Sequence, residues 1–251
     1  PSLQRVNELS CMESSAGLVV EAGFMLRFHP NLKWIKDFLE SGQLGQVFHL
    51  RASVGQHLSS WRPGTDYRQG YGARRASGGG VIFDLIHELD LMTWFAGPVY
   101  EVSAMTRYIP SLGIETEAIA HIVLRLGEGV LAQVQLDYVR PGYARTLEIV
   151  GELGVLNWDY PLGVVHLSLA DGTSKVVHKV PGEFVRNSMF LEHMDYFLRR
   201  VSDPALPPKS SLSDGIDALR IALACHRSAE EGKHVTPAEI DSNYQVKGGL
   251  A

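Results

Sequence analysis

Cysteine is scarce in this sequence: 251 residues contain two, Cys11 and Cys225. Two cysteines cannot build the disulfide framework of a small secreted domain, so we expect both to be reduced core residues of a cytoplasmic protein. No apolar run approaches the roughly 18 residues of a membrane-spanning helix, and the N-terminus lacks the charged-then-apolar pattern of a signal peptide. These absences argue against a membrane protein and against secretion.

Positive charge is not in excess either. The 23 Lys and Arg residues against 28 Asp and Glu give a formal net charge of −5 and a pI near 6.1. Such a balance offers no basic stripe for nucleic acid. With 45% hydrophobic residues, the chain is long enough for one substantial core. The composition therefore predicts a folded domain that binds neither nucleic acid nor membrane.

The most distinctive stretch is GGGVIFDLIHELD, residues 78–90. Three glycines permit a tight turn, and the apolar residues after them continue to Gly97, which predicts one buried helix of about four turns. We interpret His87 as an acid–base residue that titrates near neutrality, with Asp84 three residues earlier to orient it. The alternative is structural, with the acids favouring the helix N-terminus and His87 packed in the core.

A loop of about twenty residues, residues 59–80, precedes this helix, and loops of that length are usually functional or disordered. Its aromatic rings offer stacking faces, and its arginines offer fork-shaped donors for carboxylate or phosphate. This combination fits an acidic sugar or a sugar nucleotide, whereas a solvated or subunit-facing surface is the alternative. The predicted substrate contacts of the loop are Trp61, Tyr67, Arg68, Tyr71 and Arg74.

The remaining pattern predicts an α+β fold. Residues 46–56 and a series of segments from Tyr100 to Val180 alternate as strands, and helices follow. We expect an open, largely antiparallel or mixed sheet with helices packed on one face. Its other face would then form a homodimer or homotetramer. The first of the late helices is predicted to bury Met189, Phe190, Met194, Phe197 and Val201.

The pattern GGGxxxDxxHExD, with RFHP some fifty residues before it and SLSDGIDALRIALACHRSAEEGKHV near the end, resembles the glucose-fructose oxidoreductase / inositol dehydrogenase / MocA family. The resemblance runs from about residue 18 to about residue 240. It implies a dehydrogenase that uses NAD or NADP on a small sugar, cyclitol or nucleotide sugar. It also implies a two-domain protein, with an N-terminal Rossmann domain and a C-terminal open-sheet domain.

The resemblance gives roles to individual residues. It implies that His87 transfers a proton and that Asn187, near the start of a helix, contacts the substrate. Many members space the aspartate and the histidine four residues apart, so His87 aligns firmly and Asp84 only with a one-residue slip. Arg27 becomes a candidate contact for the cofactor or the substrate. A simple ion pair at a domain junction is the alternative for Arg27.

The glycine-rich GxGxxG loop that holds the pyrophosphate of a dinucleotide does not occur in the sequence. We therefore interpret residues 1–25 as a remnant of the dinucleotide-binding domain, with a helix from Leu3 to Met12 and the strand GLVVEAGF. Pro1 would be the proline of the family's Glu-Lys-Pro motif. Residues 26–251 would form the substrate-binding and oligomerisation domain. Without the loop, the chain alone is not expected to bind NAD(H) or NADP(H) tightly.

Two other classes of function remain open from the residues alone. Asp84, His87, Glu88 and His193 are metal-ligand types, which fits a metal-dependent isomerase or hydrolase, although their spacing matches no usual ligand pair. We expect no metal at this site. The other class is a non-catalytic dimerisation or scaffold module that consists of the sheet domain.

Overall fold

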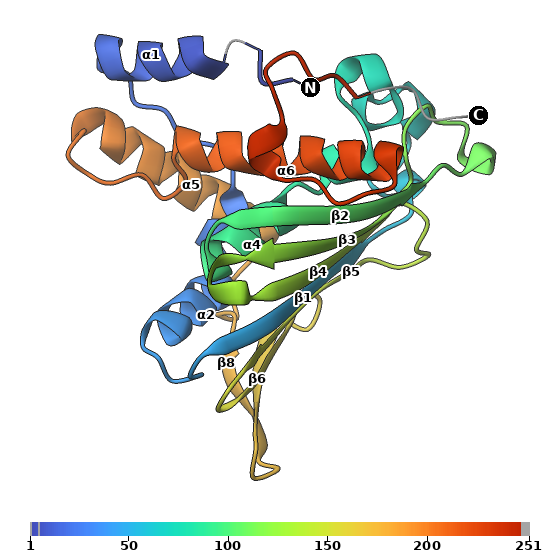
Figure 1. Cartoon of the computed structure of the whole chain (residues 1–251). Helices are drawn as coiled ribbons and strands as arrows, with labels where there is room; N and C mark the ends of the chain where they lie inside the picture. Colours follow the sequence, from blue (N-terminus) through green and yellow to red (C-terminus); the bar gives the residue numbers. More distant parts are fainter. Residues whose placement is uncertain (1, 5, 247–251) are drawn as a thin grey trace.

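Within residues 2–4 and 6–246, which the computed structural model describes, eight strands form one sheet in the order β2-β3-β4-β1-β5-β6-β7-β8 (Figure 1). Pro1, with its predicted place in a Glu-Lys-Pro motif, lies outside the described residues. The strands are β1 (Val47–Gly55), β2 (Val99–Arg107), β3 (Ile119–Leu126), β4 (Leu131–Asp137), β5 (Ala144–Gly151), β6 (Gly154–Asp159), β7 (Val164–Leu169) and β8 (Ser174–Lys179).

The sheet is mixed, as predicted. Strand β1 runs parallel to β4, with His49 opposite Leu131, and every other neighbouring pair of the described strands is antiparallel. Strand β3 shows why the sequence forms a half-covered sheet: its residues alternate between buried and exposed from Ala120 to Leu126. One face therefore belongs to the core and the other to the surface.

Helices cover the core face of this sheet (Figure 1). Their bounds are α1 (Val6–Ala16), α2 (Pro30–Glu40), α3 (Val81–Asp84), α4 (His87–Ala96), α5 (Arg186–Ser202) and α6 (Leu212–Glu231). Short 3-10 turns fill the connections, at Met25–Phe28, Leu58–Ser60, Tyr67–Gln69, Tyr71–Ala73, Arg75–Ser77, Pro110–Leu112, Gly127–Gly129 and Pro237–Glu239. None of the described helices is long and apolar enough to cross a membrane.

The start of α2 shows how local sequence sets an element's bounds. Proline at the first helical position loses no hydrogen bond, because the first amides of a helix have no partner within it. The Nδ1 atom of His29 accepts a hydrogen bond from the amide of Asn31 at 3.2 Å and so caps the helix. The helix ends at Glu40, before Ser41 and Gly42, as the sequence predicts.

The outer face of the sheet is mixed in character. Met105 is 79% exposed, and Val123 and Leu131 are about half exposed among polar neighbours. This is the face on which we predict that two copies of the chain meet, and the assembly stays a prediction.

The N-terminal segment differs from expectation. Residues 17–24, predicted as a strand, form none, because no described strand lies beside them. Ala22 instead exchanges hydrogen bonds with Ser210. The first helix begins at Val6 rather than Leu3. Cys11 is exposed on that helix, so the prediction of a core position was wrong for Cys11, while Cys225 is fully buried.

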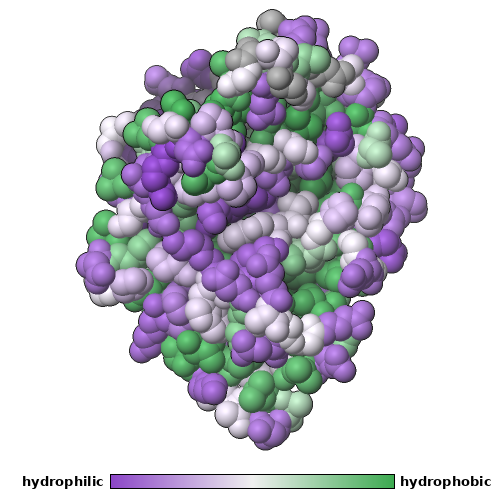
Figure 2. All heavy atoms as spheres, turned by 90° about the vertical axis from the view of Figure 1, so that its left-hand side faces the viewer, coloured by the Kyte–Doolittle hydropathy of each residue, from purple (hydrophilic) through white to green (hydrophobic). Residues whose placement is uncertain are grey.

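Helix α5 buries a different stripe from the predicted one. Met189 is buried as expected, but Phe190, Met194 and Val201 are 41 to 57% exposed. The reason is polar: Tyr196 donates to the carbonyl of Pro207, and Arg200 donates to the carbonyl of Leu206 and pairs with Glu21, so these residues turn inward. Figure 2 faces this side of the molecule, where hydrophobic surface lies in patches among polar residues.

Candidate functional site

The glycine-rich stretch leads into two helices instead of one. Helix α3 ends at Asp84, the chain turns at Leu85, whose backbone is not helical (φ −108°, ψ 28°), and α4 begins at His87. The prediction of one continuous helix was therefore wrong. Because of the break, Asp84 and His87 are not related by helical i, i+3 geometry.

Two of the three glycines are required by their surroundings. Gly80 has φ of 122°, and a Cβ there would meet the Glu117 carboxylate. A Cβ on Gly79 would meet the carbonyl oxygens of Tyr71 and Gly72. These close approaches bring the preceding loop against the start of α3 and so place Tyr71 beside Asp84.

Glu117 fixes the start of α3 through a buried hydrogen bond. Its carboxylate accepts a hydrogen bond from the amide of Ile82 at 3.2 Å, and the side chain is 3% exposed. Burial raises the pKa of Glu117 to about 7. The Nε2 atom of His226 lies 3.8 Å from this carboxylate. The sequence analysis did not single out Glu117, which positions the helix that carries Asp84.

We expect Glu117→Gln to change how stability depends on pH. A carboxyl whose pKa is raised on folding contributes stability that is present below its unfolded value, near 4.5, and is lost as pH rises through about 7. The free energy of unfolding of the unmodified chain should thus fall relative to the variant by about 3 kcal/mol between pH 4.5 and 8. Urea unfolding at several pH values measures this difference. Glu115→Gln, two residues away and exposed, is the control, and parallel profiles for all three proteins would contradict the assignment.

Asp84 is held by tyrosines. The hydroxyl of Tyr138, on the residue after β4, donates to its carboxylate at 2.5 Å, and Tyr71 also donates to it. Burial is the main influence on this carboxyl and raises its pKa, against the opposing effect of the two hydroxyls and of Arg62. The carboxylate makes no hydrogen bond with His87 in the described structure. The predicted orienting pair is therefore replaced by an Asp84–Tyr138 pair.

His87 lies at the first position of α4, with its ring edge-on to Phe24. Its Nδ1 atom is buried without a hydrogen-bond partner among the described residues. Burial, followed by the positive charges of Arg145 and Arg186, lowers the pKa of His87 to about 3. The prediction that His87 titrates near neutrality was wrong: the imidazole is neutral at physiological pH.

A cavity of about 370 Å³ brings the two predicted catalytic residues together after all. Both Asp84 and His87 line it. Apart from the amide of Gln56, the other lining residues are aromatic, basic or apolar, and they are Met25, Val54, Gly55, Trp61, Arg62, Tyr71, Leu85, Tyr143, Arg145 and Arg186. We call this space the His87 cavity.

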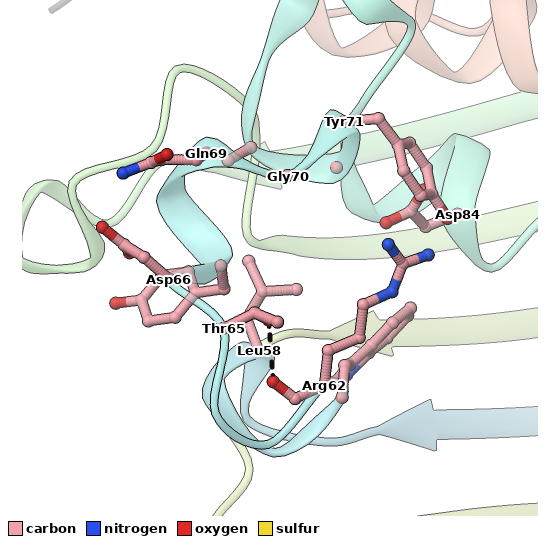
Figure 3. A pocket seen from close by; sticks show the side chains of 12 residues that line it. Leu58, Arg62, Thr65, Asp66, Gln69, Gly70, Tyr71 and Asp84 are labelled. Carbon is pink, nitrogen blue, oxygen red and sulfur yellow. Dashed lines mark hydrogen bonds between the residues drawn. The ribbon is translucent and has the colours of Figure 1, made fainter.

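A second cavity, of about 310 Å³, adjoins the first within the loop of residues 58–73, and we call it the loop cavity. It shares four lining residues with the His87 cavity, namely Trp61, Arg62, Tyr71 and Asp84. Figure 3 shows Arg62 extending toward Asp84 and Tyr71, whereas Gln69 points away. The guanidinium of Arg62 lies 5.6 Å from the centre of the Tyr71 ring. The two cavities therefore share one wall, which includes Asp84.

The structure separates the predicted substrate contacts into two groups. Trp61 and Tyr71 line both cavities, and Tyr67 lines the loop cavity while its hydroxyl donates to the carbonyl of Leu112. Arg68 instead pairs with Asp66 at 2.8 Å on the surface. Two more predicted contacts, Arg74 and Asn187, are exposed and line neither cavity.

Arg145 was not predicted, and it is the most deeply placed cation of the His87 cavity. Its Nε donates to one Glu88 oxygen at 2.6 Å and its Nη2 to the other at 3.0 Å, with both side chains buried. A signal existed in the sequence, because Arg145 is in phase with the buried Leu147 and Ile149 of β5. An arginine on the buried face of a strand indicates a buried partner of opposite charge.

Arg27 forms a network of ion pairs within the domain, and its predicted ligand contact stays a prediction. Its guanidinium binds both oxygens of Asp90, at 2.6 and 3.1 Å, reaches Asp214 at 3.2 Å and donates to the carbonyl of Lys209. The side chain is 6% exposed and does not line the His87 cavity. The alternative stated for Arg27, a carboxylate pair at a junction of elements, matches this arrangement.

The residues considered for a metal site do not converge. Both oxygens of Glu88 are occupied by Arg145, and His193 stacks on Phe28 with its Nε2 atom 3.3 Å from Glu21. Among the described residues no group of three His, Cys, Asp or Glu side chains is arranged to hold a metal ion.

Comparison with known proteins gives the chain a family. The inositol 2-dehydrogenase/D-chiro-inositol 3-dehydrogenase of Lacticaseibacillus casei is 26% identical over 242 residues, which are 92% of this chain and 65% of that protein. The crystal structure of myo-inositol 2-dehydrogenase from Lactobacillus plantarum has a TM-score of 0.73 at 26% identity, covering 92% of this chain and 69% of that one. An oxidoreductase from Agrobacterium radiobacter, in complex with NAD+, L-tartaric acid and magnesium, shares the fold with a TM-score of 0.77 at 21% identity, covering 94% and 70%.

The chain thus spans about two thirds of the length of these relatives. Residues 32–157, half of the chain, match the model of the GFO/IDH/MocA C-terminal domain. That stretch contains β1, the loop, α3, α4 and the strands up to β6, and so includes His87 and most of its cavity. This chain belongs to the GFO/IDH/MocA family.

Proposed function

We propose that this chain forms the substrate-binding part of a nicotinamide-dependent oxidoreductase that acts on a hydroxyl or carbonyl of a sugar, cyclitol or nucleotide sugar. Residues 26–251 would form the substrate domain, and residues 1–25 would belong with a dinucleotide-binding domain. The observation that carries the proposal is the His87 cavity, in which a neutral imidazole with an unpartnered nitrogen lies beside a carboxylate, arginines and aromatic rings.

The family supports this reaction class. Curated relatives at 26 to 28% identity are named inositol dehydrogenases. A solved relative at 26% identity is a myo-inositol 2-dehydrogenase. These names support a polyhydroxylated ring as the substrate, and they leave the choice between NAD and NADP to experiment.

The residues present fit one end of such a cofactor. Met25, Val54 and Leu85 give the His87 cavity an apolar wall, which suits a flat nicotinamide ring. A cavity of about 370 Å³ holds that ring beside a small substrate but not a whole dinucleotide. A bound nicotinamide would supply the hydride acceptor or donor. The binding of the pyrophosphate would depend on other residues.

The chain's own groups have separate tasks in this proposal. Neutral His87 accepts the proton of the substrate hydroxyl as the carbon gives up its hydride, and returns the proton in the reverse direction. Asp84, fixed by Tyr138, accepts a hydrogen bond from a second substrate hydroxyl. Trp61 and Tyr71 cover the apolar faces of the ring.

The test is an assay of the complete protein with NAD+ and with NADP+ on a panel of cyclitols, neutral sugars, sugar acids and nucleotide sugars. We expect absorbance at 340 nm to rise with one substrate class, because the reduced nicotinamide cofactor absorbs there. A protein that binds a panel member in calorimetry yet reduces neither cofactor would support the scaffold or binding function instead.

A further inference from the structure

Three arginine side chains line the His87 cavity, and they come from three separate elements. Arg62 belongs to the loop, Arg145 to β5 and Arg186 to the first turn of α5. Only Arg145 is buried and so needs a compensating charge from the protein, whereas Arg62 and Arg186 are exposed to solvent. The three cations together are still more than a neutral ring requires.

Two of the three arginines have such a partner. Arg145 is bound through two hydrogen bonds to Glu88. Arg62 extends toward Asp84 and lowers the pKa of that carboxyl (Figure 3). Each of these cations therefore faces one carboxylate of the protein.

Arg186 has none. Its guanidinium makes no hydrogen bond or ion pair with any residue of the described chain, and it lines the His87 cavity. Its charge nevertheless reaches the reacting end of the cavity, since it adds to the burial that lowers the pKa of His87. The cavity thus has three guanidiniums against two carboxylates and a neutral imidazole, which leaves one positive charge at Arg186.

A single uncompensated guanidinium selects the charge and the shape of its ligand. Its planar fork matches the two oxygens of a carboxylate. One excess charge balances a monoanion, whereas a phosphate monoester, close to a dianion at neutral pH, would leave a negative excess in the cavity. The aromatic lining by Trp61, Tyr71 and Tyr143 suits the ring that carries this group.

We propose that the substrate of the His87 cavity is a sugar acid, and that Arg186 binds its carboxylate while His87 faces a ring hydroxyl. The identification of the ligand as a sugar rests on the proposed function. The preference for a carboxylate rests on the guanidinium of Arg186, which lines the cavity without a partner among the described residues.

Isothermal calorimetry on the purified chain tests this with three probes that share one ring: D-glucuronate, D-glucose and D-glucose 6-phosphate. We expect glucuronate to bind about tenfold to a hundredfold more tightly than glucose, the range of one charge-assisted contact, and more tightly than glucose 6-phosphate. Arg186→Met should remove this preference. Arg186→Lys, which keeps the charge without the fork, should retain part of it.

Arg199→Met is the matched control. Arg199 lies on the same helix and is exposed, and it does not line the cavity, so the substitution removes the same charge away from the site. It should keep the full preference. Circular dichroism of Arg186→Met should match that of the unmodified chain, because Arg186 is an exposed residue of the first turn of α5.

Three results would overturn the proposal: no detectable binding of glucuronate, equal affinities for glucuronate and glucose, or a preference that survives Arg186→Met. Tighter binding of glucose 6-phosphate would overturn it in favour of a sugar phosphate. The readout involves no nicotinamide, so its failure is distinct from failure of the oxidoreductase assay. A chain that prefers glucuronate while the complete protein reduces no cofactor would keep the carboxylate site and refute the enzyme.

Discussion

Replacing His87 by alanine in the complete protein is expected to lower turnover by a factor of about 10² to 10⁴, the usual contribution of a positioned proton-transfer group. Burial and neighbouring arginines lower the pKa of His87 to about 3, so its imidazole is neutral from pH 6 to 9. The loss should therefore be similar across that range. Steady-state rates at saturating substrate measure the effect, and dinucleotide affinity should stay close to normal.

His193→Ala is the control for this experiment. His193 is a histidine of the same domain, but it stacks on Phe28 and faces Glu21 outside the His87 cavity. Its replacement should change turnover far less. Near-normal turnover of His87→Ala from pH 6 to 9 would show that the histidine after the three glycines is structural.

Arg145→Met is expected to destabilise the fold by about 3 to 5 kcal/mol, because it leaves the Glu88 carboxylate buried without a partner. Most of this loss should return in the double variant Arg145→Met/Glu88→Leu, which removes both charges. Urea unfolding of the three proteins at pH 7 gives the free energies. The double variant separates the effect of an unpaired charge from that of a changed side-chain volume.

Arg51→Met provides the surface comparison. Arg51 pairs with Glu148 at 3.2 Å between β1 and β5, and its side chain is 58% exposed. Such pairs contribute about 0 to 1 kcal/mol. If Arg145→Met were no more destabilising than Arg51→Met, the buried pair of Arg145 and Glu88 would not contribute the expected stability, and the charge balance assigned to the His87 cavity would be wrong.

The sheet could be predicted because its signal is local. Residues 119–126 and 131–137 alternate between buried and more exposed positions over most of their length, and the glycines between them mark a turn, so each strand and its antiparallel neighbour are visible in the sequence. The face of α5 could not be predicted in the same way. Apolar residues lie all around that helix, and the choice of buried stripe depends on where Tyr196 and Arg200 find acceptors.

Some features of the site could also be predicted from the sequence, and others could not. His87 and the glycines before it form a short, dense pattern, and the sequence suffices to single them out. The break between α3 and α4 has no periodic signal, because apolar residues occupy nearly every direction of that stretch. Arg186 has no periodic signal either, since its place in the cavity depends on how the start of α5 lies against segments far apart in the chain, among them the turn that begins at Met25.

The position of β1 in the middle of the sheet has a consequence for the order in which the chain folds. His49 pairs with Leu131 of β4 on one side and with Val150 of β5 on the other. Both partner strands therefore follow β1 in the sequence by about 80 to 100 residues. During synthesis β1 emerges with neither partner, and closing these long loops is slow. We therefore expect β1 to dock late, into a gap between two preformed antiparallel groups, and its docking to set the rate of folding.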